Sequence, residues 1–357
     1  MGQLSPGEVT DGHRMRRCAR SVTGCRPSGQ EMVGAQWVRR FRISDMYDVR
    51  TANPADREAV IALVTRLQQE PAHRIAFHGE TPQEVAEELA AIEPEWPAAA
   101  VVAEDRNGRL RGVLSVEVDT GQRRAYLYGP FVDVPANHPA AGNLWQATAD
   151  AMFHEARALP ALAGVHVLEL FAHRENRLLA GFADRHGIRP AITTRCFTLT
   201  AAPLRSLLVR HTPDDRVVPL PAEPAVRAAV AALHDRCFPG APTTGAQLVA
   251  GERHTVVVLS GDNGLLGYAG GYTQAEEYYV DVVGVAEDAR SCGVGRSLVR
   301  RLLGELAAAD GVRDRAAALI RSGNDPSERM FTKLGFELTE ELVSYRADST
   351  TAHRPAV

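Results

Sequence analysis

The segment that most constrains the fold of this chain is residues 283–303, where a valine-rich run leads through a glycine-containing loop into an amphipathic pattern. The loop, residues 290–295, reads RSCGVG. A strand that turns into a helix in this way presents the first helical amides, which have no intrahelical partner, at the positive end of the helix dipole. Because glycine lets a bulky group approach the backbone closely, the segment is typical of a phosphate-binding site.

Apolar residues at four-residue spacing predict the helix that follows the loop. Val294, Leu298, Leu302 and Leu306 fall on one stripe, and Gly311 supplies a stop. The loop has neither the Gly-Lys-Ser/Thr ending of a Walker motif nor the three glycines of a dinucleotide fingerprint. These two nucleotide-binding classes are therefore excluded.

The loop resembles the acetyl-CoA-binding motif of the GNAT acetyltransferase superfamily, Q/R-x-x-G-x-G/A, with Arg290, Gly293 and Gly295 at its fixed positions. A second stretch, residues 324–336, reads NDPSERMFTKLGF and is similar to the family's N-x-x-A-x-x-x-Y-x-K-x-G-F. Its residues predict a helix with Asp325 as the N-cap. Two motifs in the family's order are more specific than either motif alone.

The composition is that of a globular protein. The chain has 357 residues, of which 45% are hydrophobic and 24% charged, and this length suits two domains. The formal net charge of −4 argues against a nucleic-acid partner, and no run of about eighteen apolar residues predicts a membrane span. The five cysteines are scattered without a C-x-x-C pair, which predicts neither a metal site nor a disulfide framework and fits the cytoplasm.

Two patterns recur at similar distances along the chain. An Asn-Gly turn inside an apparent hairpin occurs at Asn107 and again at Asn263, 156 residues later. Asn176 and Asn324 each stand eleven residues before a glycine, and they are 148 residues apart. The two offsets indicate duplication of a unit of about 150 residues.

The expected fold class is therefore α/β (α+β), with two GNAT-like domains that are each a mixed, mostly antiparallel sheet flanked by helices, as the resemblance to tandem GNAT proteins implies. The first domain has a degenerate phosphate loop, because residues 137–143 read NHPAAGN and Pro139 removes an amide. We expect this domain to be structural, or to hold a CoA in a non-catalytic pose. The expected boundaries are a basic, disordered tail at 1–43, a degenerate GNAT-like domain at 44–200, a proline-rich linker at 201–224, a catalytic GNAT domain at 225–348 and a tail at 349–357.

The resemblance implies that acetyl-CoA is the cosubstrate of the second domain. Its pantetheine arm would pair with the backbone of the strand before the loop, much as an added strand does. Asn324 would bond the pantetheine amide, whereas Phe331 stands where the family usually carries a tyrosine as general acid. The cofactor-binding residues implied in this way are Val283, Gly284, Val285, Arg290, Ser291, Cys292, Gly293, Val294, Gly295, Arg296, Asn324 and Phe331.

The general base is expected on the same strand. Strand alternation would place Glu277, Tyr279, Asp281 and Val283 on one face. We expect Tyr279 and Glu277, and after them Asp281, to act directly or through a water. The alternative is that these side chains merely occupy a solvated strand end. His254, which opens an earlier strand, receives no role.

The function that the resemblance implies is an acetyl-CoA-dependent N-acetyltransferase that transfers the acetyl group directly to the amine of a small molecule. A cytoplasmic monomer or homodimer is expected, without nucleic acid, membrane or metal. The layout also resembles that of the mycothiol synthase family, which acetylates a cysteinyl pseudo-disaccharide, but residues 319–323 lack that family's tyrosine and acidic residue. A non-catalytic acyl-CoA-binding protein, and an acyltransferase for longer acyl chains or a hydroxyl acceptor, stay open.

Overall fold

The computed structural model describes residues 47–134, 138–210, 214–239, 241, 243–251, 253–262, 264–274 and 276–348. Contacts divide them into two compact units. The N-terminal unit contains residues 47–193 and 341–348, and the C-terminal unit contains residues 194–340. The expected tails at 1–43 and 349–357 and the two residues Asn137 and Asn263 lie outside the described residues.

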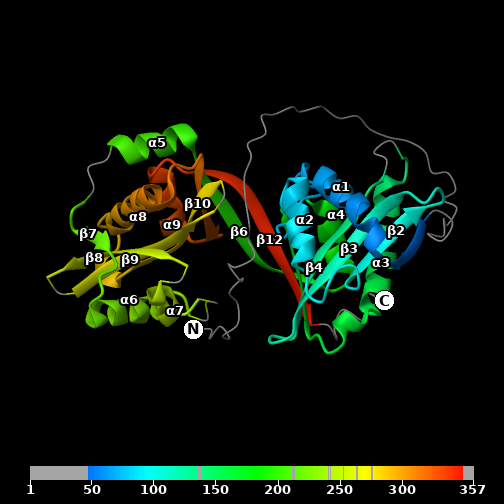
Figure 1. Cartoon of the computed structure of the whole chain (residues 1–357), viewed down its shortest axis with the longest axis horizontal. Helices are drawn as coiled ribbons and strands as arrows, with labels where there is room; N and C mark the ends of the chain where they lie inside the picture. Colours follow the sequence, from blue (N-terminus) through cyan, green and yellow to red (C-terminus); the bar gives the residue numbers. More distant parts are fainter. Residues whose placement is uncertain are drawn as a thin grey trace. The chain divides into compact units, whose positions relative to one another are not determined.

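The N-terminal unit is built on strands in the order β1-β2-β3-β4-β5-β12, of which β2, β3 and β4 are labelled in Figure 1. Strands β4 and β5 are parallel, and the other neighbouring pairs are antiparallel. The strands are β1 (Tyr47–Thr51), β2 (Ala100–Asp105), β3 (Leu110–Asp119), β4 (Arg124–Val132), β5 (Val167–His173) and β12 (Glu337–Asp348). The helices are η2 (Pro54–Asp56), α1 (Arg57–Gln68), α2 (Pro82–Ala90), α3 (Ala141–Arg157), η3 (Pro160–Leu162) and α4 (Arg177–Arg185).

The C-terminal unit has strands in the order β6-β11-β10-β9-β8-β7, with β10 and β11 parallel and the rest antiparallel. The strands are β6 (Arg189–Thr200), β7 (Val217–Pro219), β8 (Thr255–Gly261), β9 (Gly264–Thr273), β10 (Glu277–Val285) and β11 (Arg315–Arg321). The helices are α5 (Ala201–Arg210), α6 (Pro224–Cys237), α7 (Gly245–Ala250), η4 (Glu287–Ala289), α8 (Val294–Asp310) and α9 (Asp325–Lys333).

Both units repeat one element order. Two helices precede three antiparallel strands, and a helix, a strand parallel to the third, another helix and a long final strand follow. The series α1-α2-β2-β3-β4-α3-β5-α4-β6 thus returns as α6-α7-β8-β9-β10-α8-β11-α9-β12. The expected fold class of two mixed, mostly antiparallel sheets flanked by helices is confirmed.

The division of the chain differs from the expected boundaries at 44–200 and 225–348. Strand β12 pairs with β5 through Leu342–Asp348, so these residues belong to the N-terminal unit. Strand β6 pairs with β11 through Thr194–Thr200, so these residues belong to the C-terminal unit. Each long final strand therefore contributes to both units, which no local pattern in the sequence reveals.

The expected proline-rich linker at 201–224 contains regular structure. Helix α5 and strand β7 both lie within it. Pro203 falls in the first turn of α5, where an amide would have no intrahelical partner, and Pro224 begins α6. Pro203 and Pro224 therefore mark helix starts.

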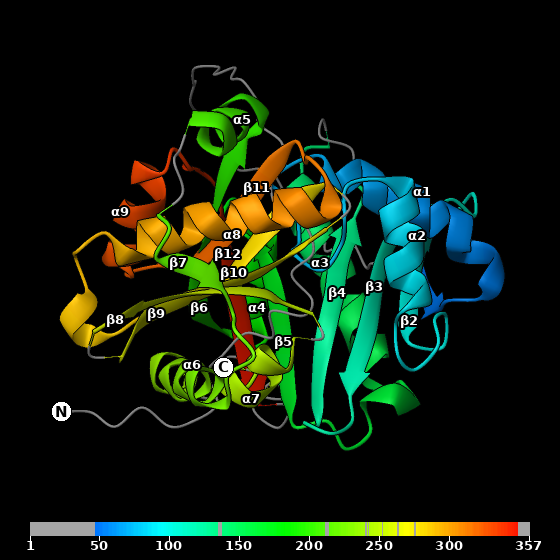
Figure 2. The same ribbon diagram turned by 60° about the vertical axis from the view of Figure 1, so that its left-hand side comes forward.

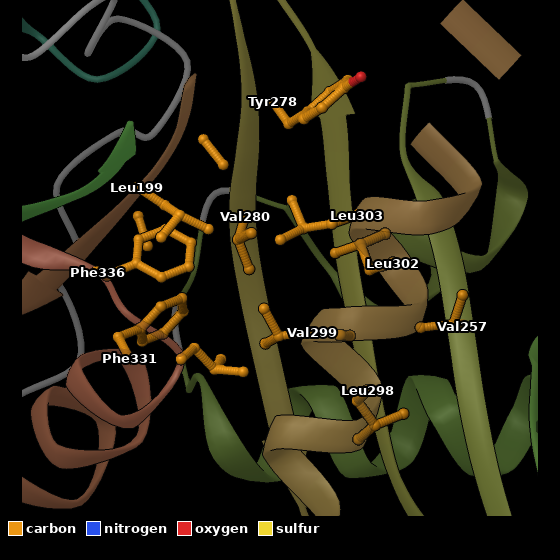
Figure 3. Packing of buried hydrophobic residues seen from close by; sticks show 14 of the residues in the cluster. Leu199, Val257, Tyr278, Val280, Leu298, Val299, Leu302, Leu303, Phe331 and Phe336 are labelled. Carbon is orange, nitrogen blue, oxygen red and sulfur yellow. The ribbon is translucent and has the colours of Figure 1, made fainter. Parts of the chain in front are cut away.

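The apolar stripe predicted for 294–310 is confirmed as the core of the C-terminal unit. Helix α8 lays Leu298, Leu302 and Leu303, all fully buried, against Val257 and Val280 of the sheet (Figure 3). Burying each such side chain contributes about 1.5–3 kcal/mol. Figure 2 shows α8 crossing the strands of this sheet. The stripe thus fixes the N-terminus of α8 against the end of β10, next to the loop.

Helices α6 and α7 cover another part of this sheet. Val230 and Leu233 of α6 and Leu248 of α7 pack with Val256 and Tyr268.

Among the residues that the structure describes, no helix combines the length and apolar character that crossing a membrane requires.

Candidate active site

The loop before α8 presents unpaired backbone amides. Gly293 is the N-cap, in a left-handed conformation with φ of 86°, and no side chain caps the helix. Ser291 is also left-handed, with φ of 64°. The amides of Arg296 and Ser297 both donate to the Gly293 carbonyl, whereas no acceptor among the described residues takes the amides of 291–295. Such a turn at a helix N-terminus forms a concave donor site for an anion.

A pocket of about 450 Å³ adjoins these amides. Three arginines and the Asp288 carboxylate line it, and Leu259 and Leu266 supply apolar lining. One of the three arginines, Arg216, is paired with Asp214 at 2.8 Å. The lining residues are Arg216, Leu259, Leu266, Asp288, Ala289, Cys292, Gly293, Val294, Arg296, Ser297 and Arg300. The predicted residues Cys292, Gly293, Val294 and Arg296 thus lie together at a cationic hollow.

The remaining predicted loop residues have structural contacts. Arg290 is exposed, and its Nε atom donates to the Val285 carbonyl at 3.4 Å, so its guanidinium folds over the end of β10. Gly295 lies against α9, since a Cβ built there would be 2.5 Å from the Met330 sulfur. The glycine at 295 therefore permits close helix packing as well as any approach of a ligand.

Strands β10 and β11 separate part of the way along their length. Their parallel register runs from Glu277 to Val280 and ends there, opposite Ala318. Strand β11 continues to Arg321 in register with β6, and β10 continues to Val285 in register with β9. The unpaired stretch between β10 beyond Val280 and β11 beyond Ala318 is here called the gap, and β10 continues from it to the loop.

The backbone of β10 has donors that point into this gap. The Ala286 amide donates to Leu266 on the β9 side at 2.9 Å. Because donors alternate along an antiparallel ladder, the Gly284 amide also faces β9, whereas the amides of Val283 and Val285 face the gap. The side chains of these two valines pack on the core beside α8. The strand thus offers backbone groups rather than side chains.

A β-bulge overturns the expected alternation. The β9–β10 register shifts between Val280 and Val282, which makes Asp281 the extra residue. Val283 therefore lies on the face of Val280, which packs under α8, and not on the face of Glu277 and Tyr279 as expected. A one-residue shift of this kind reverses every later side chain.

Glu277 forms a buried ion pair with Arg315. Its Oε2 atom accepts from Arg315 Nε at 2.7 Å, and its side chain is only 2% exposed. The pair joins β10 to the adjacent strand β11 where their register begins. An enclosed, paired carboxylate is poorly placed to collect a proton from a substrate amine.

This ion pair leads to a stability prediction. Arg315→Met removes this ion pair from the buried Glu277 carboxylate, and we expect the free energy of unfolding to fall by about 3–5 kcal/mol. Urea unfolding measures the loss. The control is Arg329→Ala, which removes an ion pair whose side chains are 67% and 68% exposed and should cost less than about 0.5 kcal/mol. Equal losses in the two variants would contradict a structural role for the pair.

Tyr279 lies in an aromatic row. Its ring is 5.2 Å from that of Tyr272, which in turn meets His254 edge-on at 5.4 Å. Tyr279 is 5% exposed and packs on Ala317. Burial, reinforced by the nearby Asp281 carboxylate, raises the pKa of Tyr272 to about 12, so that hydroxyl stays protonated at neutral pH.

Asp281 is the most accessible of the three predicted bases. Its side chain is 20% exposed, and its Oδ2 atom lies 2.7 Å from Nε2 of His254, whose side chain is 4% exposed. Asp281 is also the first residue of β10 beyond its last pair with β11, at the opening of the gap. The bulge residue Asp281 therefore lies where the β10–β11 pairing ends, and its carboxylate is hydrogen-bonded to the His254 imidazole.

His254 is a candidate functional residue that the sequence did not reveal. It precedes β8, and the β8–β9 register continues to set it opposite Tyr272. The signal lies in the pairing of three strands together with the bulge, and neither can be read from spacing along the chain.

Asn324 and Phe331 differ in exposure. Asn324, and not the expected Asp325, is the N-cap of α9; its side chain accepts from the Ser327 amide at 3.4 Å, and the residue is exposed. Phe331 is 4% exposed and meets Phe336 edge-on at 5.0 Å within the core. Phe331 is thus a core residue of the C-terminal unit. Among the described residues, no cluster of His, Cys, Asp or Glu is arranged to hold a metal.

The comparisons with known proteins agree with this geometry. Residues 227–336 match the Acetyltransferase (GNAT) family. A GCN5-related N-acetyltransferase from Sphaerobacter thermophilus has a similar fold, with a TM-score of 0.57 and 17% identity over 85% of this chain and 95% of that one. A tandem GNAT protein from the clavulanic acid biosynthesis pathway is similar at a TM-score of 0.54 and 16% identity, over 87% and 100%. No curated protein matches the chain significantly.

The stretch of the C-terminal unit that matches the GNAT acetyltransferase family is residues 227–336, and the chain as a whole has a fold similar to that of a tandem GNAT protein.

Proposed function

We propose that this protein is an acetyl-CoA-dependent N-acetyltransferase that acts on a small-molecule amine, with the chemistry in the C-terminal unit. The observation that carries this proposal is that β10 and β11 stop pairing beyond Val280 and that, beyond the end of β10, no described acceptor takes the amides of 291–295. The free cysteines Cys196, Cys237 and Cys292 fit a reducing compartment such as the cytoplasm.

The site would hold acetyl-CoA mainly through its backbone. The amides of Val283 and Val285 would pair with the pantetheine arm as an added strand would. The amides of 291–295 and the Arg296 guanidinium would take the diphosphate. The exposed side-chain amide of Asn324 would reach the pantetheine from the α9 side.

The transfer needs a neutral amine. In this mechanism Asp281 takes a proton from the acceptor's ammonium group. The amine nitrogen then attacks the thioester carbonyl and a C–N bond forms. As the C–S bond breaks, the nitrogen gives up its second proton through water to the departing CoA thiolate. A backbone amide facing the gap would stabilise the charge on the carbonyl oxygen. His254 acts as a positioning residue, since its hydrogen bond fixes the orientation of the carboxylate.

The acceptor class rests on similarity. The structural neighbours include proteins described as N-acetyltransferases, one of them a glucosamine N-acetyltransferase region of a fungal β-N-acetylglucosaminidase, with a TM-score of 0.54 and 13% identity over 84% of this chain and 38% of that one. Amines are therefore the first acceptors to test. The accessible acidic residue at the gap suits a cationic amine.

The experiment is thiol release from acetyl-CoA by the full chain in the presence of an amine panel that includes amino sugars and a cysteinyl pseudo-disaccharide. We expect turnover with at least one amine and slower turnover with longer acyl-CoAs. Saturable CoA binding without turnover of any acyl-CoA would identify an acyl-CoA-binding protein instead. Turnover only with longer chains or with alcohols would reassign the substrate class.

A further inference from the structure

We infer that the corresponding cleft of the N-terminal unit is filled by the protein's own chain, so that each chain binds one CoA, in the C-terminal unit. The inference that the cleft is filled concerns the N-terminal unit alone. The inference that each chain binds one CoA rests on the proposed function. The segment that fills it is residues 74–78, here named the plug.

The strand registers establish which positions correspond. The parallel pairs begin at Arg124 with Val167 in the N-terminal unit and at Glu277 with Arg315 in the C-terminal unit. The third strands are thus offset by 153 residues, and the parallel strands by 148. In the N-terminal unit this register stops at Tyr126 and Glu169, although β5 continues to His173 in register with β12. A strand gap therefore opens in both units.

The plug pairs with the edge of β5 that faces this gap. Ile75 forms an antiparallel bridge with Ala172. The Ala76 amide donates to the Phe171 carbonyl at 2.8 Å, and the His173 amide donates to the Arg74 carbonyl at 3.1 Å. The plug thus takes the backbone groups that a strand-like ligand would otherwise meet there.

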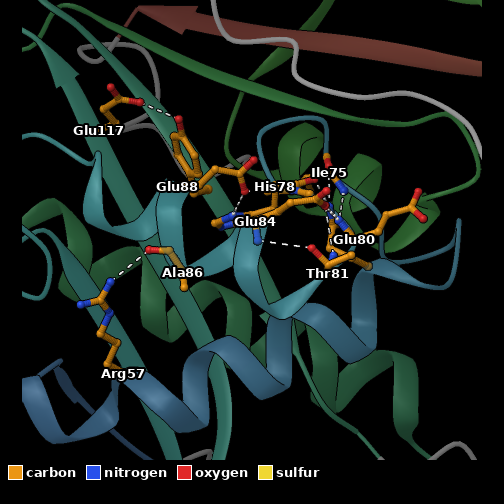
Figure 4. A network of polar contacts seen from close by, with 12 residues as sticks. Arg57, Ile75, His78, Glu80, Thr81, Glu84, Ala86, Glu88 and Glu117 are labelled. Atoms are coloured by element: carbon orange, nitrogen blue, oxygen red, sulfur yellow. Dashed lines mark hydrogen bonds and ion pairs between the residues drawn. The ribbon is translucent and has the colours of Figure 1, made fainter. Parts of the chain in front are cut away.

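A buried glutamine holds the plug in place through three hydrogen bonds. Gln68, fully buried at the end of α1, accepts from the Ile75 amide at 2.8 Å and donates to the carbonyls of Ile75 and His78 at 3.0 and 2.6 Å. The His78 ring also contacts the Glu88 carboxylate at 3.2 Å (Figure 4). Removing any one partner leaves a buried polar group unpaired, which makes release of the plug costly.

Aromatic packing fills the rest of the gap. The Phe77 ring stacks on Tyr128 at 4.9 Å, and His78 meets the same tyrosine edge-on at 5.1 Å. By the 153-residue offset, Tyr128 stands where the C-terminal unit has Asp281. Its hydroxyl donates to Glu117 at 2.6 Å within the core. The position of the proposed base is thus occupied by a buried phenol that the plug covers.

The N-terminal counterparts of the other proposed CoA-binding groups either bond within the protein or lack an amide hydrogen. Asn176, the counterpart of Asn324, is 2% exposed, and its side-chain amide donates to the Arg74 carbonyl of the plug at 3.4 Å. Pro130, the counterpart of Val283, has no amide hydrogen. Before α3, the Ala140 amide donates to the ring of His138 at 3.2 Å. No comparable contact takes the amides of 291–295 among the described residues of the C-terminal unit.

The plug exists because one connection is longer in the N-terminal unit. Residues 69–81 join α1 to α2, whereas residues 238–244 join α6 to α7, which is six residues fewer. The longer connection supplies enough chain to reach β5.

The first test is calorimetric titration of the full chain with CoA. We expect one CoA site per chain. Gly293→Asp should reduce the affinity of that site at least about a hundredfold. The matched control is Gly142→Asp, the same change near the start of α3, where a Cβ meets nothing within 4 Å; it should leave affinity and stoichiometry unchanged. Two sites per chain, or a site in Gly293→Asp that Gly142→Asp removes, would overturn the inference.

The second test measures hydrogen exchange of the plug, first without ligand and then with CoA. In hydrogen exchange, the amides of Ala76 and His173 should exchange at least about a hundredfold more slowly than in an unfolded chain, and saturating CoA should leave them unchanged. Gln68→Ala should accelerate both amides by about tenfold or more, because it removes the hydrogen bonds that hold the plug. Fast exchange in the parent protein refutes the plug. Slow exchange in a chain that binds no CoA refutes only the proposed function.

Discussion

Gly293→Asp is expected to weaken CoA binding at least about a hundredfold, or by ~3 kcal/mol. Gly293 is the left-handed N-cap of α8, and a Cβ there would lie 3.5 Å from the Arg296 guanidinium. The new carboxylate would face the bound diphosphate and compete for Arg296. Two like charges 4 Å apart repel by about 4 kcal/mol near a protein surface. Calorimetric titration measures the affinity, and steady-state kinetics should show a higher KM for acetyl-CoA.

The control for this prediction is Gly293→Ala, which shares the backbone strain but adds no charge. A non-glycine residue in the left-handed region costs about 1–2 kcal/mol, so the alanine variant should lose about tenfold in affinity. The additional loss in the aspartate variant should shrink at high salt, because screening weakens the repulsion. Equal losses for alanine and aspartate would mean that the loop does not face an anion.

The C-terminal unit was predictable in its local features. The strand, the loop and helix α8 follow from the glycines at 293 and 295 and from the four-residue spacing of Leu298 and Leu302. These signals depend on neighbours within one turn of helix or one loop. The duplication was visible for the same reason, because Asn176 and Asn324 each cap a helix that ends at a glycine-containing turn.

The contacts that complete the candidate site depend on residues distant in the sequence. The bulge at Asp281 arises from the pairing of β10 with β9 and reverses the faces of Val282 and Val283. His254 reaches Asp281 across strand β9. Periodicity places residues on a strand but does not say which strands are neighbours or where a register shifts. The same limit hid the division of β6 and β12 between the units.

The burial of the candidate bases was also hidden from the sequence. Acidic and tyrosine residues on one strand are equally suited to catalysis until their partners are known. Glu277 is neutralised by Arg315, and Tyr279 is enclosed by Tyr272 and Ala317. Asp281, the extra residue of the bulge, keeps a side chain that is 20% exposed and has an imidazole rather than a cationic arginine as its partner. The order of the three bases proposed from the structure is therefore the reverse of the order expected from the sequence.

Asp281→Asn is expected to lower kcat by about 10²–10⁴-fold, the usual contribution of a general base, with little change in KM for acetyl-CoA. The amide keeps the size of the carboxylate but cannot take a proton from the ammonium group of the acceptor. As pH rises toward the acceptor's own pKa, solvent supplies more neutral amine, so the deficit relative to the parent enzyme should narrow. Thiol release measured across pH tests both statements.

Three further variants separate catalysis from packing. Tyr279→Phe keeps its ring against Tyr272 and should change kcat less than about threefold, since in this mechanism its hydroxyl moves no proton. His254→Leu removes the hydrogen bond to Asp281 and should lower kcat by about tenfold or more. His254→Gln can restore a donor near the position of Nε2 and should recover most of that loss. If His254→Gln is folded but does not recover kcat, His254 moves a proton itself. If Asp281→Asn retains full kcat, the base lies elsewhere.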